Sequence, residues 1–398
     1  MNILLFDHPE IRRSLLPLTF TRPVADIRLG ILTIAEKWRF EFNHSVSFLT
    51  QGYLSAKYPA VMKEDNLYIN GALCPDQHLL EKISNLSSGK GLRQGDIIIA
   101  FRSGPFDSLG ELADVVDLCE PYEDHMTLIR NTWQLFLSNG DQIKADYPRV
   151  INGRESHPLT DPHTIVYNQE NLFIEEGVRI KAAIINAENG PVYLGPNSEI
   201  QEGTIIQGPF ALGNYSQLRL GGKMRPNTTI GPFCKIGGEV GNVIFQSNSN
   251  KAHEGFLGNS VIGSWCNLGA DTNNSNLKNN YSNVRSWSYL ENAFVDTGLQ
   301  FCGLIMGDHS KSSINTMFNT GTVVGVCANI HGVGFPAKFT PSFIWGGAGS
   351  TTEYDFEKAC ETIAKVMERR SLSFSEVERS ILEHIYQQTA ENRLSTLK

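Results

Sequence analysis

The chain has 398 residues, enough for two domains that each bury their own core. Its formal net charge is −8, only 19% of its residues are charged, and no run of Lys or Arg stands out. Nucleic acid and anionic membrane surfaces are therefore unexpected as main partners.

The first residues, MNILLFDHPEIRR, lack the length and the cleavage site of a signal peptide. No window approaches 18 uninterrupted apolar residues, so no membrane span is expected. The seven cysteines are odd in number and without CxxC spacing, which predicts reduced thiols and no disulfide frame or zinc site. A cytoplasmic protein is the expectation.

Residues 1–165 mix strand-like runs with helical patterns. The strand-like runs are NILLFD, SVSFLT, NLYING and DIIIAFR, and the helical patterns cover residues 30–42 and 131–147. Strands that alternate with helices predict an α/β layer domain over 1–165.

The middle of the chain follows a period of six. Aliphatic residues recur in one phase without exception, with Gly, Asn or Pro between them: Leu194, Ile200, Ile206, Leu212, Leu218, Met224, Ile230 and Ile236. In a hexapeptide repeat each short strand points one aliphatic side chain inward, and the turns require Gly or Asn. The pattern predicts a parallel β-helix, a three-sided prism, over residues 166–350.

The phase breaks after Ile236 and is expected to resume at Phe256, Ile262 and Leu268. It breaks again and returns at Met306, with Ser312 as the one polar member of the later series. Two excursions, over roughly 242–255 and 273–300, are therefore predicted to leave the prism, and loops of this kind often carry function.

Residues 351–398 have helical periodicity. Phe356, Cys360, Ile363 and Met367 form one apolar stripe, and a second helix is expected after Ser375, which has capping-box spacing to Glu378. These helices are expected to cover the end of the prism, because an open sheet edge invites aggregation.

The stretches RPNTTIG and NKAHEGFLGNSVIGSWCNLGADT resemble the acetyltransferase half of the bifunctional GlmU family, most closely its divergent sugar nucleotidyltransferase-like members. In that family a Rossmann-like nucleotidyltransferase domain precedes a left-handed β-helix that acetylates a sugar phosphate from acetyl-CoA. The resemblance implies a left-handed prism, homotrimers, acetyl-CoA or another acyl-CoA as co-substrate, and Mg²⁺ with a nucleoside triphosphate.

Matched residue by residue, the resemblance places His253 at the position of the general base, a role that suits imidazole at neutral pH. It places Asn267 and Asn276 at substrate contacts and Ala270 where backbone groups meet the pantetheine arm. Arg225 matches an arginine that faces a sugar phosphate, for which a guanidinium is a suitable anion clamp.

The chain also departs from the family pattern. Phe245 and Ser247 stand where the family has a Glu and a Lys that contact the acceptor, and Asp271 replaces a glycine. In LLPLTFTRPVA the phosphate-binding glycines are absent, and Val24 stands at the lysine position.

Positive charge in the N-terminal half would come instead from Arg13, Arg22 and Arg28, expected as substrate-binding residues. Asn70 stands where the family has the aspartate that binds Mg²⁺, and asparagine is a poorer ligand for this ion. No metal ligand is assigned.

Three functions follow as hypotheses. The first is a transferase of sugar-nucleotide metabolism, a nucleotidyltransferase, an acyltransferase or both, acting on a sugar phosphate or nucleotide sugar. The second is a trimeric binding or scaffold protein with a degenerate nucleotidyltransferase domain. The third is a metal site of the γ-class carbonic anhydrase type, which would use histidines on the prism such as His309 and His331, otherwise expected as turn residues.

Overall fold

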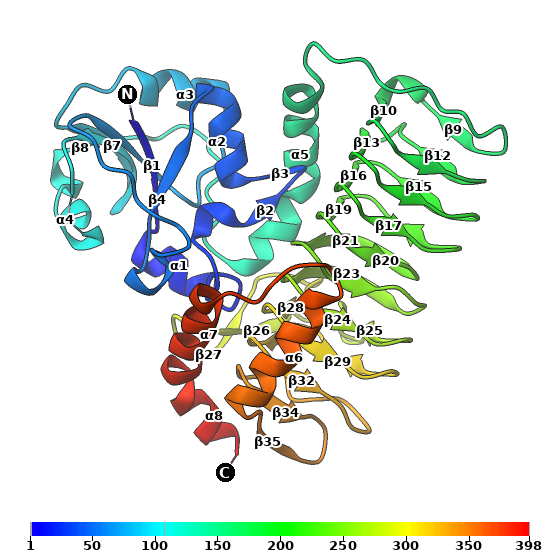
Figure 1. Cartoon of the computed structure of the whole chain (residues 1–398). Coiled ribbons are helices and arrows are strands. Elements are labelled where there is room, and N and C mark those ends of the chain that lie inside the picture. The colour runs from blue at the N-terminus through cyan, green and yellow to red at the C-terminus, as the bar shows by residue number, and fades with distance from the viewer. Residues whose placement is uncertain (1, 107, 398) are drawn as a thin grey trace.

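A computed structural model describes residues 2–106 and 108–397. An α/β sheet domain lies beside a tall three-sided prism of short strands, and the last helices lie next to the lower coils of that prism (Figure 1). Within the described residues, no helix has both the length and the apolar character needed to cross a bilayer.

The N-terminal sheet has six strands in the order β4-β1-β5-β7-β6-β8. The pairs β4–β1 and β1–β5 are parallel, β5–β7 and β7–β6 are antiparallel, and β6–β8 is parallel. The four predicted strands are confirmed within this sheet. Its members are β1 (Asn2–Phe6), β4 (Val46–Leu49), β5 (Asn66–Asn70), β6 (Lys90–Gln94), β7 (Ile97–Ser103) and β8 (Cys119–Pro121).

Both helices predicted in this domain are present. The first, α2 (Ile34–Phe42), begins later than its pattern, because the preceding residues form a small hairpin of β2 (Arg28–Leu29) and β3 (Leu32–Thr33). Thr33 and Glu36 form a capping box at its start. The second is α5 (Thr132–Ile151), and the shorter elements are α1 (Pro9–Ser14), η1 (Val24–Asp26), η2 (Gly52–Leu54), α3 (Gln77–Ser84), α4 (Leu109–Ala113) and η3 (Val116–Leu118).

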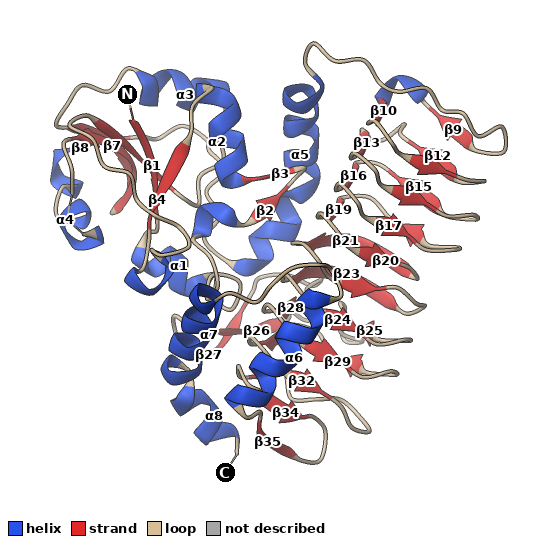
Figure 2. Ribbon diagram, in the orientation of Figure 1, coloured by secondary structure: helices blue, strands red, loops and turns tan. Residues whose placement is uncertain are grey.

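The prism is a parallel β-helix of the left-handed hexapeptide class, with three faces of stacked short strands (Figure 2). The first face contains β9 (Ile165–Tyr167), β12 (Ile184–Asn186), β15 (Ile205–Gln207), β18 (Lys223–Met224), β25 (Asn273–Asn274) and β30 (Met317–Phe318). The second contains β10 (Leu172–Ile174), β13 (Val192–Leu194), β16 (Phe210–Leu212), β19 (Thr228–Ile230), β28 (Leu304–Met306), β31 (Thr322–Val324) and β33 (Phe339–Thr340).

The third face contains β11 (Arg179–Ile180), β14 (Glu199–Ile200), β17 (Gln217–Leu218), β20 (Lys235–Ile236), β22 (Asn250–Lys251), β24 (Asn267–Leu268), β29 (Lys311–Ser312), β32 (Asn329–Ile330), β34 (Ile344–Gly346) and β35 (Thr351–Glu353). Two longer strands, β21 (Glu239–Phe245) and β23 (Phe256–Ile262), run around the corner from the first face to the second. A short 3-10 turn, η4 (Gln169–Asn171), lies in the first coil.

The predicted inward series is confirmed. All eight aliphatic residues of the series from Leu194 to Ile236 are buried, and each has 0–1% of its surface exposed. They form one continuous apolar core along the prism axis. Stacking the coils removes this apolar surface from water, which no single coil could do alone.

The first predicted excursion is wrong. Residues 239–251 stay on the prism, because β21 and β22 pair with the coils on both sides. Corners in this coil are shorter: Met224 pairs with Val240 and Ile230 with Phe245. The shift in phase therefore comes from lost corner residues, and Leu257, not Phe256, points inward as the partner of Val240.

The second predicted excursion is confirmed. After β25 the chain leaves the prism, forms the hairpin of β26 (Arg285–Ser288) and β27 (Ala293–Asp296), and returns at β28. Trp287 of this hairpin stacks on Phe339 with ring centroids 4.2 Å apart, so the hairpin is packed against the lower coils.

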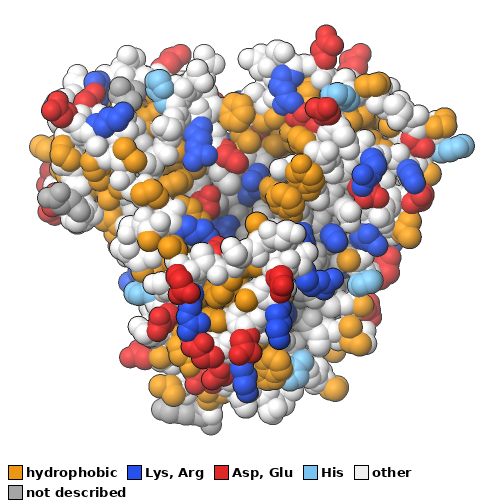
Figure 3. Space-filling model, in the orientation of Figure 1, with side chains coloured by type: hydrophobic (Ala, Val, Ile, Leu, Met, Phe, Trp, Pro, Cys, Tyr) orange, Lys and Arg blue, Asp and Glu red, His pale blue; other side chains and the backbone are white. Residues whose placement is uncertain are grey.

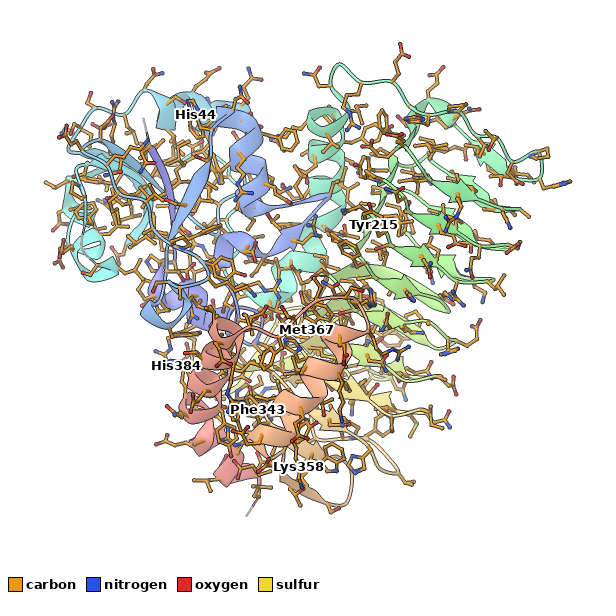
Figure 4. The ribbon with its side chains drawn as sticks, in the orientation of Figure 1. His44, Tyr215, Phe343, Lys358, Met367 and His384 are labelled. Atoms are coloured by element: carbon orange, nitrogen blue, oxygen red, sulfur yellow. The ribbon has the colours of Figure 1, made fainter. Side chains whose placement is uncertain are left out.

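The two predicted C-terminal helices, α6 (Phe356–Glu368) and α7 (Glu376–Gln388), are present, with the Ser375–Glu378 capping box. A third helix that was not predicted, α8 (Ala390–Thr396), follows them. Phe343 at a prism corner contacts Phe356 of α6 and Tyr386 of α7, and it lies between these helices in Figure 4. His384 of α7 stacks on Tyr53 with centroids 4.1 Å apart, so the helices also contact the N-terminal domain.

Helix α5 joins the N-terminal domain to the prism through buried polar contacts. The Asn139 side chain donates to the carbonyl of Asn227 at 2.8 Å and accepts from the Gly30 amide at 2.8 Å. The hydroxyl of Thr229 donates to the Gly30 carbonyl at 2.9 Å. Unpaired polar groups at such buried positions would be unfavourable, so these bonds fix how the two parts sit together.

Candidate functional site

A cavity of about 240 Å³ lies where the N-terminal domain, the prism and helix α7 meet. The N-terminal domain contributes Thr21, Arg22, Asp26, Lys57 and Tyr58; the prism contributes Ser247, Asn248, Ser264, Trp265, Asp308 and His309; and α7 contributes Glu378, Ile381 and Leu382. We call this space the interdomain cavity. Its lining is mostly polar or charged, so it offers hydrogen-bonding and charged groups to a polar ligand.

A buried ion pair between Arg22 and Asp308 joins two walls of the cavity. Arg22 also donates to the Ser264 hydroxyl at 2.9 Å, and Asp308 accepts from the Thr21 hydroxyl at 2.7 Å and the Ser264 amide at 2.8 Å. Burial alone would raise the pKa of Asp308, but the Arg22 guanidinium holds it below its usual value. Both groups are therefore charged at neutral pH.

Asp26 is the second carboxyl group of the cavity. It accepts a hydrogen bond from the Tyr58 hydroxyl at 3.0 Å. Burial raises the pKa of Asp26, and the nearby Arg22 opposes this only in part. A carboxyl group of this kind can exchange a proton closer to neutral pH than an exposed aspartate can.

Lys57 lies at the mouth of the cavity, with 40% of its side chain exposed, and pairs with Glu378 of α7 at 3.1 Å. Such a partly exposed ion pair contributes little stability, so the ammonium group can bind another anion instead without a large loss of stability. Lys57 and Arg22 are thus the two cations that face this space.

His309 and Trp265 lie parallel, with ring centroids 6.3 Å apart and planes inclined by 2°. Burial lowers the pKa of His309 to about 3, although Asp308 favours the charged form. The imidazole is therefore neutral at physiological pH and is a weak base.

The four residues proposed from the N-terminal sequence lie in different places. Arg22 lines the interdomain cavity. Arg13 is exposed and its Nη2 donates to the Leu290 carbonyl at 3.4 Å. The Arg28 amide donates to Gln246 Oε1 at 2.7 Å, and its side chain lies 3.6 Å from Glu36. Asn70 is fully buried.

The residues at the carboxyl ends of β1 and β5 do not fit the Mg²⁺ implied by the family resemblance. Asn70 donates to the Ile98 carbonyl at 2.9 Å and accepts from the Ala72 amide at 3.0 Å, so both the nitrogen and the oxygen of its side-chain amide already form hydrogen bonds. Asp7 accepts from the Val24 amide at 2.8 Å and from Thr50, and lies 3.4 Å from Arg12. Neither oxygen set is free to hold a hard cation.

His253 lies on the prism and not on a lifted loop. It is exposed in the turn between β22 and β23, beside a hollow of about 230 Å³ that Arg219, Leu220 and Glu254 also line. Lys251, at an inward position of the prism, donates to the His253 carbonyl at 3.0 Å. This bond fixes the backbone that carries the imidazole.

Arg225 and Asn276 lie together in another hollow, of about 320 Å³. Arg225 pairs with Glu239 at 3.0 Å, and the Asn276 side chain donates to Asn259 at 2.8 Å. This hollow and His253 flank opposite ends of the short strands of the first face, since Arg225 follows β18 and His253 precedes β23. One subunit therefore does not bring these residues together.

The other prism residues singled out in the sequence also lie at separate places. Asn267 is exposed on β24, and Ala270, in the following turn, accepts from the Asn315 amide at 2.8 Å. Of the departures from the family pattern, Phe245 points into the prism core and Asp271 is exposed. Ser247 lines the interdomain cavity and bonds to Ser264 at 2.9 Å.

A groove of about 280 Å³ is lined by residues of the β2–β3 hairpin, of α2 and α5, and of the second face of the prism. The space-filling view shows a notch between the N-terminal sheet domain and the lobe that contains α5 and the prism (Figure 3). Arg28 and Glu36 lie on one side, and Tyr193 and Phe233 on the other. Its walls are less charged than those of the interdomain cavity, and we assign it no ligand.

Most of the cavity was missed by sequence reasoning. Asp26, Lys57, Tyr58, Trp265 and Asp308 were not singled out, and His309 was expected to be a turn residue. His309 does occupy a turn, with φ of 61°, yet its ring faces the cavity. One available signal was that His309 and Trp265 both follow a Gly-x pair at a corner of the repeat.

No three His, Cys, Asp or Glu side chains within residues 2–106 and 108–397 group as ligands for a metal ion. His331 lies against Trp345 with ring centroids 5.5 Å apart. It follows β32, whereas His309 precedes the neighbouring strand β29, so the two histidines lie at opposite ends of adjacent strands. A carbonic anhydrase-type centre gains no support from this arrangement.

Residues 3–155 match the family model described as sugar nucleotidyl transferase. A comparison with curated proteins gives no match. Solved structures that resemble the chain include the polySia specific acetyltransferase NeuO, at 13% identity and a TM-score of 0.28, covering 48% of this chain and 85% of that one. The UDP-N-acetylglucosamine acyltransferase from Campylobacter jejuni matches at 13% identity and a TM-score of 0.25, covering 61% and 91%.

The corresponding Francisella novicida acyltransferase matches at 13% identity and a TM-score of 0.25, covering 61% of this chain and 87% of that one. Likenesses of this extent carry no conclusion about activity. The sugar nucleotidyl transferase match thus covers the α/β domain, and a left-handed β-helix follows it, which is the two-domain order expected from the sequence.

Proposed function

We propose that the chain is a transferase of sugar-nucleotide metabolism and that its phosphate-bearing substrate binds in the interdomain cavity. The observation that supports this most is the convergence of family-matched residues on a polar space. Arg22, Asp26, Lys57 and Tyr58 all lie within the matched residues 3–155, and all four line the cavity.

Phosphate binding would use the two cations. Arg22 is held by Asp308, but its buried Nε has no hydrogen-bond partner among the described residues. Lys57 at the mouth is only loosely engaged by Glu378 and can meet a phosphate as a flexible point charge. A substrate that places its sugar inside and its phosphate near the mouth would satisfy both.

Asp26 is the strongest candidate for proton transfer in the same space. Its raised pKa and its bond from Tyr58 suit a group that takes a proton from a substrate hydroxyl as that hydroxyl attacks. The neutral His309 is a weaker base and is better suited to orient a substrate by hydrogen bonding.

The test is a turnover assay with a panel of sugar-1-phosphates, nucleoside triphosphates and Mg²⁺, following pyrophosphate release. Lys57→Gln is expected to raise KM, and Asp26→Asn to lower kcat. Lys90→Gln, an exposed lysine on β6 remote from the cavity lining, is the matched control and should behave like the unaltered protein. Unaltered kinetics in Lys57→Gln and Asp26→Asn would contradict the assignment of the cavity.

A second candidate activity is acyl transfer at the prism edge, with His253 as the base and an acyl-CoA as donor. It is favoured by the exposed imidazole beside its hollow and by the Lys251 bond that fixes the turn. Because Arg225 and Asn276 lie at another edge, this site would be completed by a neighbouring subunit.

Stacked isoleucines on the first face support such a trimer. Ile165, Ile184 and Ile205 pair in register on successive coils and are 52%, 38% and 41% exposed. Contiguous apolar surface of this kind is typical of an interface. Sedimentation measurements should show a trimer that Ile184→Glu weakens.

Free-thiol release from acetyl-CoA with amino-sugar acceptors tests the acyl transfer. His253→Ala should abolish release, whereas His157→Ala, an exposed histidine outside the prism hollows, should not. If neither pyrophosphate nor thiol is released with any substrate, the protein is a binding or scaffold protein, and the transferase proposal fails.

A further inference from the structure

One corner of the prism carries a ladder of residues in the left-handed backbone conformation. Tyr215, Phe233, Asn248, Trp265 and His309 occupy it on successive coils, with φ between 55° and 63°. Each of these residues is one rung of the ladder. Its backbone amide donates to the carbonyl of the residue that directly precedes the rung on the coil before, as in the bond from Trp265 to Ser247, which precedes Asn248, at 3.1 Å. We call these five residues the corner ladder. Tyr215 is visible on this edge in Figure 4.

Rings on adjacent rungs stack. Tyr215 and Phe233 have centroids 5.2 Å apart and planes inclined by 6°, and Trp265 and His309 are 6.3 Å apart and inclined by 2°. The spacing follows from the separation of neighbouring strands, about 4.8 Å, which lies within the range of about 4.5–7 Å between the centroids of paired aromatic rings.

The rung between these two pairs has no ring. Asn248 stands there, with a short amide side chain that donates to Ser247 at 3.3 Å. Since His309 covers one side of Trp265, the side toward Asn248 is the one that the ladder leaves without a ring. Both Asn248 and Trp265 line the interdomain cavity.

We propose that a nucleobase occupies the empty rung, stacked on Trp265, with the Asn248 amide at its edge. A base presents a flat π-face to an indole and both donors and acceptors to an amide, which can serve as either. The inference rests on the proposed function, and it gives the substrate of the cavity a chemical class: a nucleoside phosphate.

The rest of the cavity fits the remainder of such a ligand. Its volume of about 240 Å³ is below the range of about 300–1,000 Å³ typical of sites that enclose a whole ligand. The base and part of its ribose would be enclosed, and the phosphates would extend to Lys57 at the mouth. The Ser247 and Ser264 hydroxyls lie beside the ring position and can bond to the ribose or to the base.

The same chemistry could come from a nucleotide sugar or from the adenine nucleotide of coenzyme A. Calorimetric titrations with UDP, ADP and coenzyme A separate these sources, and pyrophosphate is the probe without a base. We expect at least one base-bearing ligand to bind about tenfold more tightly than pyrophosphate, the contribution typical of one base stacked on an aromatic side chain.

Two variants act on the rung itself. Trp265→Ala should remove the tenfold advantage while the affinity for pyrophosphate stays unchanged, and Trp265→Phe should retain most of it. Asn248→Trp places a ring of the chain in the empty rung, a conformation that Trp265 already adopts one coil later, and should block the base while pyrophosphate still binds. Trp345→Ala, at a 41% exposed tryptophan outside the cavity, is the matched control.

Equal affinity of Trp265→Ala and the unaltered protein for UDP, ADP and coenzyme A would overturn the inference. So would base-bearing ligands that bind no better than pyrophosphate. If pyrophosphate binds, and Lys57→Gln weakens it without any effect of a base, the nucleobase site fails but the phosphate site of the proposed function stands. If no probe binds at all, both fail.

Discussion

The upper and lower coils of the prism differ in regularity, and the difference separates scaffold from site. From Leu194 to Ile236, residues that pair across neighbouring coils are eighteen apart, as Leu194, Leu212 and Ile230 show. Below Ile236 the corners shorten, and Ile230 pairs with Phe245 and Ile236 with Lys251.

In the lower coils, polar residues replace members of the inward aliphatic series. Lys251 and Ser312 take inward positions that aliphatic residues hold in the upper coils, and both are buried. All six prism residues that line the interdomain cavity, from Ser247 to His309, also belong to the lower coils. The upper coils thus supply a continuous apolar core, and the lower coils carry the polar groups that a ligand needs.

The largest expected effect is loss of the pair between Arg22 and Asp308. Arg22→Ala leaves the Asp308 carboxylate buried without its partner, which should lower the free energy of unfolding by about 3–5 kcal/mol. Urea denaturation measures this. Arg225→Ala, which breaks an exposed pair with Glu239, is the matched control and should have a much smaller effect. Equal effects of the two variants would contradict the distinction between the two arginines.

Truncation of inward residues compares the two sets of coils directly. Leu212→Ala removes a fully buried side chain from a regular coil and should cost about 2–5 kcal/mol through the cavity that it leaves. Ser312→Ala, in a lower coil, removes a hydroxyl that lies 3.0 Å from Thr272 and should cost only about 1 kcal/mol. A larger loss for Ser312→Ala would show that the lower coils are the main source of stability.

Because of Lys251, the free energy of unfolding should change with pH in the alkaline range. Burial lowers the pKa of Lys251 to about 8, whereas the unfolded value is 10.5. Between these values the unfolded chain binds more protons, so the folded protein gains stability as pH rises from about 8 to 10.5. The gain should be about 2–3 kcal/mol relative to Lys251→Met, at about 1.36 kcal/mol for each pKa unit.

Thermal unfolding between pH 7.5 and 10.5 measures the gain. Lys235→Met, an exposed lysine on the coil above, is the control and should follow the unaltered protein at every pH. A constant difference between the unaltered protein and Lys251→Met over this range would show that the ammonium group is not desolvated in the prism.

Because of His309, the free energy of unfolding should change with pH in the acidic range. Burial lowers its pKa to about 3 from an unfolded value of 6.5, so the unfolded chain binds more protons between these values and stability falls as pH drops below 6.5. At pH 5 the penalty should be about 2 kcal/mol. His309→Gln should remove this part of the acid sensitivity, and parallel pH profiles for the two proteins would contradict a buried neutral imidazole.

Much of the scaffold could be predicted because its signals are local. The period of six identified the inward aliphatic series from Leu194 to Ile236, and the spacing of Ser375 and Glu378 marked the start of α7. The shortened corners could not be predicted in this way. A lost corner residue shifts the phase just as a loop does, so residues 242–255 looked like an excursion and Phe256 took the place of Leu257.

The interdomain cavity could not be predicted from the sequence, for a different reason. Arg22, Trp265 and Glu378 are far apart in the sequence, and only the docking of three parts brings them together. The sequence identified Arg22 as a cation near a phosphate motif, but its partner Asp308 had no local signal. Residues taken from the prism resemblance, such as His253 and Arg225, remain predictions for a site that would need a second subunit.

A crystal structure with a bound nucleoside diphosphate sugar tests the central claim most directly. The account predicts the base against Trp265 and the phosphates near Lys57 and Arg22, inside the interdomain cavity. Density for the ligand at the carboxyl ends of β1 and β5, beside Asp7 and Asn70, would contradict it.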